Sequence, residues 1–186
     1  LSALEGKETI QFRAVLGHEA AGVIEAIGDR VTSLKEGDMV IMSWTPACGV
    51  CPSCKRGEVH LCRRINMTTE RKGPLSQNDE GVDRFMGLGA FCEHIVVPEA
   101  MAVPVSTTLT PNHSCLIGCG VTTGFGAAVN TAAVRWGESV AVLGCGGVGL
   151  AAVQGARIAG AARIFAIDPI PERRQVAINV GATAAF

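Results

Sequence analysis

The chain has 186 residues, of which 48% are hydrophobic and 18% are charged, so it can bury one large core or two small ones. A formal net charge of −1 excludes a strongly basic face, and nucleic acid is therefore not an expected partner. The sequence contains no uncharged apolar run of about eighteen residues, so we expect no membrane span.

The first hundred residues have the pattern of a β-rich domain. Residues 14–42 read as strands and turns, with the β-tolerant run AAGVIEAIG at 20–28 and a Gly-Asp turn before the short apolar run at 39–42. A polar stretch rich in turn-forming residues predicts a loop over 64–84. The run at 90–105 reads as strand, turn and strand, in which two prolines end the pieces.

A cluster of four cysteines interrupts this β-rich part. Cys48, Cys51, Cys54 and Cys62 have the spacing C-x2-C-x2-C-x7-C. Four thiolates this close in sequence can complete a tetrahedral shell around one zinc ion. Such a shell has no open coordination position, so we expect the zinc to be structural and to hold together a compact lobe at 47–63.

Three other interpretations of the cysteine cluster compete with zinc. A disulfide framework is typical of secreted chains, but nothing like a secretory signal precedes the cluster. A redox site needs only one C-x-x-C pair, whereas this run has overlapping pairs and a fourth cysteine. An iron–sulfur cluster also takes four cysteine ligands and is the closest rival. The eight cysteines of the chain indicate a reducing compartment, and we expect the cytoplasm.

The pattern changes in the second part of the chain. Residues 112–134 are small and apolar and read as helical, and the apolar run at 139–144 is typical of a parallel strand buried on both faces. A helix pattern follows, then a second buried strand at 162–168 and a helix that begins at Pro171. Alternating strands and helices predict an α/β fold with a parallel sheet. We place the domain boundary near residue 120.

A glycine-rich turn joins the first buried strand to its helix and predicts a dinucleotide site. The glycines of this turn allow a tight bend, a close approach of the pyrophosphate and close packing of the helix on the strand. An acidic residue that ends the next strand is suited to bind the adenosine ribose, and its charge favours NAD over NADP. The residues of this motif are Gly144, Gly146, Gly147, Gly149 and Asp168.

Taken in order, these motifs resemble the zinc-dependent medium-chain alcohol dehydrogenases. The motifs are Gly17-His18-Glu19, the four-cysteine lobe, Gly118-Cys119-Gly120 and the nucleotide turn, and the resemblance is to the class III-like subgroup with a structural zinc. It implies a GroES-like catalytic domain over 1–120 and the first part of a Rossmann domain, with a doubly wound parallel sheet, over 121–186. Relatives of this kind are homodimers or homotetramers, which we expect of the full-length protein.

The resemblance also assigns roles to single residues. His18 and Cys119 match ligands of a catalytic zinc, and Glu19 matches an acid beside that metal. The other matches are Thr123 and Val148 near the nicotinamide, Phe85 and Met86 in the substrate pocket, and Arg173 beside the adenosine ribose.

Part of the family's catalytic machinery is expected outside this sequence. The chain begins at Leu1 and ends at Phe186, so we read it as an internal fragment of a longer protein. The resemblance implies that the third zinc ligand, a cysteine, and the hydroxyl residue of the proton relay lie upstream of Leu1. Ser2 falls near the outer member of that relay.

The expected function is hydride transfer between a primary or secondary alcohol and NAD, with one catalytic and one structural zinc. A thiol-dependent formaldehyde dehydrogenase shares all these motifs, and a non-catalytic, zinc-stabilised NAD-binding fragment is the third alternative. The remaining side chains of the same types are expected to be inert: Cys92, Cys115 and Cys145 as packing, and His60, His94 and His113 as surface or packing residues.

Overall fold

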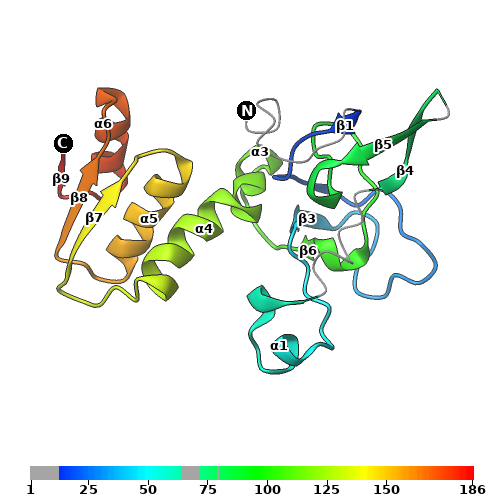
Figure 1. Ribbon diagram of the computed structural model, residues 1–186, viewed down its shortest axis with the longest axis horizontal. Coiled ribbons are helices and arrows are strands. Elements are labelled where there is room, and N and C mark those ends of the chain that lie inside the picture. Colours follow the sequence, from blue (N-terminus) through cyan, green and yellow to red (C-terminus); the bar gives the residue numbers. More distant parts are fainter. Residues whose placement is uncertain (1–12, 64–71, 79) are drawn as a thin grey trace. The chain divides into compact units, whose positions relative to one another are not determined.

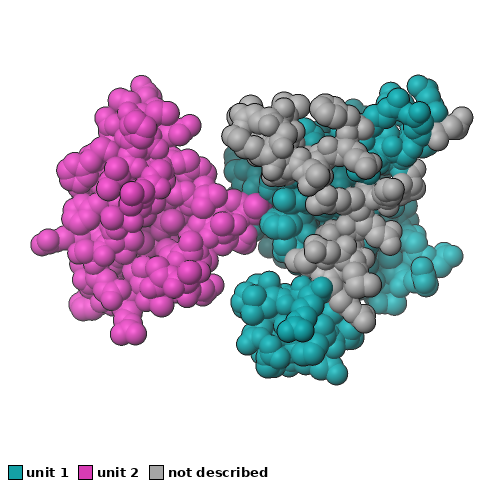
Figure 2. Space-filling model, in the orientation of Figure 1, with its two compact units in different colours: residues 1–118 teal, residues 119–186 magenta. Residues whose placement is uncertain are grey.

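The computed structural model describes residues 13–63, 72–78 and 80–186 (Figure 1). The chain forms two compact units, residues 1–118 and residues 119–186 (Figure 2). Ser2, which we expect near the proton relay, lies outside the described residues. Within the described ranges, no helix has the length and apolar character that crossing a bilayer requires.

The core of the first unit is built around an antiparallel sheet. Strands β2 (Ala21–Val23), β3 (Met39–Met42) and β6 (Ala102–Pro104) follow one another in the order β2-β3-β6. The turn between β2 and β3 is closed by backbone hydrogen bonds between Ile24 and the Gly37–Asp38 turn, so the predicted turn there is confirmed. Side chains from the sheet and its connections form the core: Leu34, Val40, Met42, Leu88, Met101 and Ala102.

A hairpin occupies most of the segment 64–84, for which we predicted a loop. Strands β4 (Lys72–Gln77) and β5 (Glu80–Arg84) pair antiparallel, and β1 (Ala14–Val15) runs parallel to β5. The prediction is therefore wrong for 72–84, and 64–71 lies outside the described residues. Most of the described hairpin is polar and exposed, so its strands lack the apolar alternation that sequence reasoning depends on.

The run at 90–105 forms only part of the predicted strand, turn and strand. Its second piece is present as a 3-10 turn, η3 (Glu99–Met101), followed by β6, but residues 90–98 form no strand. The N–H groups of Ala90 and Phe91 donate to the carbonyls of Gly17 and Leu16, and the pairing extends no further into a ladder. The sequence pattern identified the extended backbone but not the missing partner strand.

The predicted helical stretch at 112–134 is confirmed as far as Thr131, although it is broken in the middle, and residues 132–134 are not helical. In the first unit it contains α3 (Pro111–Ser114) and the 3-10 helix η4 (Cys115–Gly118), and in the second α4 (Gly120–Gly126) and the π-helical turn η5 (Ala127–Thr131). Gly118 lies so close to strand β3 that a Cβ atom there would be 2.5 Å from the carbonyl oxygen of Met42. Close packing therefore explains this glycine.

The second unit is a parallel α/β sheet, as predicted. Strands β7 (Ser139–Leu143), β8 (Arg163–Ile167) and β9 (Ala184–Ala185) lie side by side in that order and run parallel. Helix α5 (Gly147–Ile158) connects β7 to β8, and α6 (Pro171–Val180) connects β8 to β9 (Figure 1).

The strands of this sheet are buried on one face only, whereas we predicted burial on both. Val142, Ile164 and Ala166 pack against Val153 and Ala156 of α5 in one core cluster. Most side chains of the alternate positions are exposed, Phe165 is half-buried, and Leu143 has 78% of its surface accessible. In the described chain the two helices contribute to the same core cluster, so they cover one face of the sheet.

Candidate functional site

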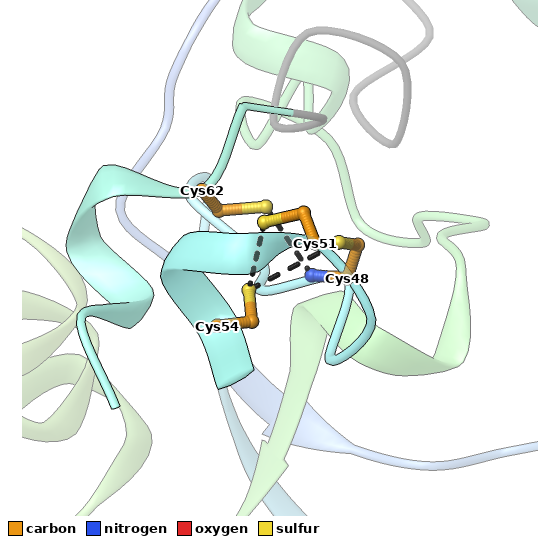
Figure 3. Close-up of side chains that lie close together, drawn as sticks. All are labelled: Cys48, Cys51, Cys54 and Cys62. Atoms are coloured by element: carbon orange, nitrogen blue, oxygen red, sulfur yellow. Dashed lines mark hydrogen bonds between the residues drawn. The ribbon is translucent and has the colours of Figure 1, made fainter. Parts of the chain in front are cut away.

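Four thiol groups converge in the lobe that we predicted to hold structural zinc (Figure 3). The sulfur atoms of Cys48, Cys51, Cys54 and Cys62 all lie within 4.8 Å of one another. The Sγ atoms of Cys51 and Cys54 are 3.5 Å apart, and those of Cys48 and Cys54 are 4.0 Å apart. A tetrahedral zinc–thiolate shell with bonds of about 2.3 Å has sulfur–sulfur edges of roughly 3.8 Å, so the cluster fits one ion.

The backbone of the lobe aims these thiols at one point. Cys51 caps the short helix α1 (Pro52–Lys55), and Gly57 ends it by donating to the carbonyl of Cys54 at 3.0 Å, with a left-handed φ of +80° that glycine adopts without strain. The 3-10 turn η1 (Val59–Leu61) then leads directly into Cys62. Since the mutual sulfur distances leave room for a single ion, the geometry favours one metal over a multi-iron cluster.

Neighbouring N–H groups already favour one thiolate in this lobe. Hydrogen bonds from the backbone of Cys54 and Arg63 lower the pKa of the Cys51 thiol to about 6. Burial, together with the neighbouring thiols, raises the pKa of Cys54 to about 11. Four thiols held this close cannot all ionise unless a cation compensates their charge, which is the role of a bound metal.

The imidazole of His18, the predicted zinc ligand, stands between two aromatic rings. Its ring centroid lies 5.6 Å from that of Phe85 and 6.2 Å from that of Trp44, both edge-on. Sequence reasoning anticipated Phe85 but missed Trp44. The register of β2 with β3 contains the signal: Ala21 faces Ile41, and the same register continued by three residues would set His18 opposite Trp44.

The residue before His18 and the residue after Phe85 both have a left-handed backbone conformation. Gly17 adopts φ +93°, and a Cβ atom there would be 2.8 Å from the ring of Phe91. Met86, which we predicted to line the substrate pocket, has a left-handed φ of +51° directly after Phe85. Both conformations are unusual for residues with side chains and turn the chain sharply beside the imidazole.

Glu19 lines a cavity of about 650 Å³ that lies entirely within the first unit. The lining also includes the side chains of Cys92, His94 and Cys115, and His94 Nδ1 is 3.0 Å from a carboxylate oxygen of Glu25. Cys92 is exposed and Cys115 half-buried, so the prediction that Cys92 packs in the interior is wrong. Its thiol donates to the carbonyl of Gly89 at 3.0 Å instead.

Cys119, the second predicted ligand of the catalytic zinc, marks the break between η4 and α4. Its backbone has φ −146° and ψ −73°, outside the helical range, and it caps α4 at the start of the second unit. The Thr123 N–H and the Thr122 hydroxyl both donate to the Cys119 carbonyl, at 2.9 and 3.0 Å. Thr123 is exposed on α4. His18 belongs to the other unit.

The glycine-rich turn in the second unit has the geometry expected of a phosphate-binding turn. Gly144 adopts a left-handed φ of +91°, and a Cβ atom on Gly149 would be 1.8 Å from the Gly144 carbonyl oxygen. The positions of Gly146 and Gly147 have open space where a Cβ atom would stand. Val148 is 47% exposed in the first turn of α5. The open turn therefore lies at a helix N-terminus, where N–H groups face outward.

Asp168 lies at the end of β8, with 4% of its surface accessible. Its Oδ2 accepts a hydrogen bond from the Cys145 N–H at 2.8 Å and its Oδ1 accepts one from the Ile170 N–H at 2.8 Å, and these bonds lower the pKa of the carboxyl group. A guanidinium nitrogen of Arg173 lies 3.9 Å from Oδ2. Cys145 is 1% exposed, as we predicted for a packing residue, and burial raises the pKa of its thiol.

Comparison with known proteins identifies a match over the first part of the chain. Residues 1–107 match the family model described as the alcohol dehydrogenase GroES-like domain. The S-(hydroxymethyl)glutathione dehydrogenase of a Synechocystis species is 45% identical over 179 residues, which are 92% of this chain and 48% of that protein. The chain therefore spans about half the length of the curated relatives it matches.

Solved structures of similar fold cover nearly the whole chain. An alcohol dehydrogenase zinc-binding domain protein from Burkholderia ambifaria is 36% identical, with a TM-score of 0.86 over 96% of this chain and 50% of that one. The benzyl alcohol dehydrogenase of Acinetobacter calcoaceticus is 33% identical, with a TM-score of 0.85 over 99% of this chain and 51% of that one.

Proposed function

The chain belongs to the alcohol dehydrogenase family with a GroES-like domain, and we propose that it contributes the zinc-binding part and the start of the NAD-binding part of a zinc-dependent dehydrogenase. The observation that carries the proposal is the open turn at Gly146 and Gly147, which lies at the N-terminus of α5 with the carboxylate of Asp168 behind it. This combination suits a pyrophosphate and an adenosine ribose.

We propose S-(hydroxymethyl)glutathione, the adduct of formaldehyde with a thiol, as the substrate. The support is the group of relatives that carry this substrate in their names and are 43 to 45% identical over 92% of the chain. The adduct is a hemithioacetal with a CH2OH group, so its oxidation by NAD removes a hydride and a proton as the oxidation of a primary alcohol does.

A simple aromatic alcohol is the second candidate. The rings of Trp44 and Phe85 border His18 edge-on and offer apolar surface to an aromatic substrate. The likeness to a benzyl alcohol dehydrogenase points in the same direction.

The proposed roles of single residues rest on the resemblance of their motifs to those of the family. A ring nitrogen of His18 and the thiolate of Cys119 would hold the catalytic zinc, and Thr123 and Val148 would border the nicotinamide. When bound, zinc would supply a Lewis acid for an alcohol oxygen and NAD would supply the hydride acceptor. The two rings beside His18 restrict the orientation of its imidazole.

The four-cysteine lobe would hold the second, structural zinc. All four coordination positions would be taken by thiolates, so this metal has no place for substrate. Its contribution is to the folding free energy, because a preformed shell of four thiolates does not exist in the unfolded chain. The chemical step would thus depend on His18 and the nucleotide turn, and the stability of the lobe on the cysteines.

The test is NADH formation by the full-length protein with three substrate sets: formaldehyde plus glutathione, formaldehyde alone, and benzyl alcohol. We expect turnover with formaldehyde only when glutathione is present. His18→Ala should reduce turnover to background while NAD still binds, and His113→Ala, an exposed histidine, should have no effect. Turnover with benzyl alcohol but not with the adduct would favour the second candidate, and full activity of His18→Ala would refute both.

A further inference from the structure

We propose that Asp168 is a positioning residue for the phosphate-binding turn: its buried carboxylate holds the Cys145 N–H and so fixes the turn before any nucleotide binds. The proposal rests on the function proposed above and adds a second role to an acid expected to contact the ribose. The distance from the Cys145 nitrogen to Oδ2 is 2.8 Å, and the two residues are 23 positions apart in the chain.

Two successive N–H groups of the turn bond to two successive residues at the end of β8. The Gly144 N–H donates to the Ile167 carbonyl at 2.8 Å, which extends the pairing of β7 with β8 by one backbone bond. The next N–H, that of Cys145, would have no strand carbonyl to bond to, and the Asp168 side chain accepts it instead. The first bond is independent of side chains, whereas the second exists only because residue 168 is an acceptor.

The other carboxylate oxygen anchors the acid from the opposite side. Oδ1 accepts the Ile170 N–H at 2.8 Å, and the Asp168 carbonyl accepts a hydrogen bond from the Arg174 guanidinium at 2.7 Å. With both oxygens engaged and 4% of the residue accessible, the carboxylate is held in one orientation. A fixed acceptor in turn fixes the peptide of Cys145, which directly precedes the open positions Gly146 and Gly147.

The positioning role and the ribose role make different predictions for a ligand without ribose hydroxyl groups. If Asp168 serves only the ribose, its replacement leaves the affinity for 2′,3′-dideoxyadenosine 5′-diphosphate unchanged. If it positions the turn, the same replacement weakens this ligand too, because the diphosphate depends on the turn. The ligand therefore separates the two roles within one binding site.

The first measurement is amide hydrogen exchange at Cys145 and Ile170 in the nucleotide-free protein. Asp168→Ala removes both acceptors, and we expect exchange at Cys145 to accelerate at least about tenfold, while amides of β7 and β8 remain protected. Asp168→Asn retains one acceptor oxygen and should give a smaller effect. If Asp168→Ala loses protection throughout the sheet because it fails to fold, the exchange rate at Cys145 in Asp168→Asn tests the proposal instead. Glu172→Gln removes a nearby exposed carboxylate and should leave exchange at Cys145 unchanged.

The second measurement is the Kd of NAD and of the dideoxy diphosphate for the same variants. We expect both ligands to bind about tenfold more weakly to Asp168→Ala, with a smaller loss for Asp168→Asn, and to bind Glu172→Gln normally. Unchanged exchange at Cys145, or weaker NAD binding with unchanged binding of the dideoxy ligand, would overturn the proposal. If neither ligand binds the unsubstituted protein, the proposed dehydrogenase function fails instead, and exchange alone then decides whether Asp168 holds the turn.

Discussion

The backbone N–H of Cys48 donates a hydrogen bond to the sulfur of Cys62 at 3.4 Å, so the first and last cysteines of the lobe are bonded across 14 positions. An N–H that points at a sulfur stabilises its thiolate form and orients it as a ligand. This hydrogen bond joins the two ends of the lobe, and a metal bound by both cysteines would join the same two ends (Figure 3). Metal binding and local folding of residues 47–63 should consequently be coupled.

Removal of one thiol of the lobe tests this coupling. Cys54→Ser should lower the zinc content by about one equivalent per chain and the melting temperature by at least about 5 °C, because metal binding contributes folding free energy. Zinc is measured by atomic emission and melting by circular dichroism. Cys92→Ser alters an exposed thiol outside the lobe and should change neither quantity. Equal zinc content and melting temperature in Cys54→Ser would contradict a structural metal here.

Alanine substitution at two glycines of the nucleotide turn should have different effects, on NAD binding at one and on stability at the other. A Cβ atom at Gly147 meets no atom within 4 Å, so Gly147→Ala should leave the melting temperature within about 2 °C and weaken NAD binding at least about tenfold. A Cβ atom at Gly149 would be 1.8 Å from the Gly144 carbonyl, so Gly149→Ala should destabilise the second unit itself. Calorimetry of unfolding and of NAD binding separates the two effects. Normal NAD affinity of Gly147→Ala would place the phosphates elsewhere.

The features predicted well from sequence are those whose chemistry is local. The cysteine spacing of the lobe and the glycine turn before α5 each specify their geometry within a few residues. Trp44 was missed because its proximity to His18 arises from the pairing of β2 with β3, which spacing alone does not reveal. The hairpin of β4 and β5 was missed for a related reason, since polar exposed strands are fixed by their partners more than by their own residues.

Helices α4 and α5 cross at a glycine that leaves no room for a methyl group. A Cβ atom at Gly124 would lie 2.0 Å from the Val148 carbonyl oxygen and 2.7 Å from the Cβ of Ala151. Gly124→Ala should therefore destabilise the second unit by about 1–3 kcal/mol in urea unfolding. Gly126→Ala is the matched control in the same helix, because its Cβ would meet only the Asn130 side chain at 3.7 Å. The control should be neutral or slightly stabilising, and equal losses in both would exclude the steric explanation.

Ser114 at the end of α3 is fully buried, and within the described part of the chain its hydroxyl has no hydrogen-bond partner. Burying an unsatisfied hydroxyl is unfavourable, so Ser114→Ala should raise the free energy of unfolding by about 1 kcal/mol. Ser33→Ala should have the opposite sign, because the Ser33 hydroxyl donates to Glu99 at 2.6 Å. Both changes are read from urea midpoints. Destabilisation by Ser114→Ala would show that the hydroxyl has a partner such as a bound water.

Glu99 ties the turn at 32–33 to η3 and should make part of the stability depend on pH. Its Oε1 accepts hydrogen bonds from the Ser33 hydroxyl at 2.6 Å, the Ser33 N–H at 2.7 Å and the Thr32 N–H at 3.0 Å. These bonds lower the pKa of the Glu99 carboxyl below its ordinary value of 4.5. Because the folded state holds the charged form more strongly, this contribution is complete above that ordinary value and is lost as pH falls through the lower folded pKa.

The experiment compares the wild-type chain with Glu99→Gln in urea at pH 7, 5, 4 and 3. We expect the wild type to be the more stable at pH 7 and its advantage to shrink below pH 4.5, where Glu99 becomes protonated and resembles the amide. Glu93→Gln, which alters an exposed carboxylate of the same unit, serves as the control for loss of charge and should show a much smaller difference at every pH. An advantage over Glu99→Gln that stays constant from pH 7 to pH 3 would mean that the shape of the side chain, and not its charge, holds the turn.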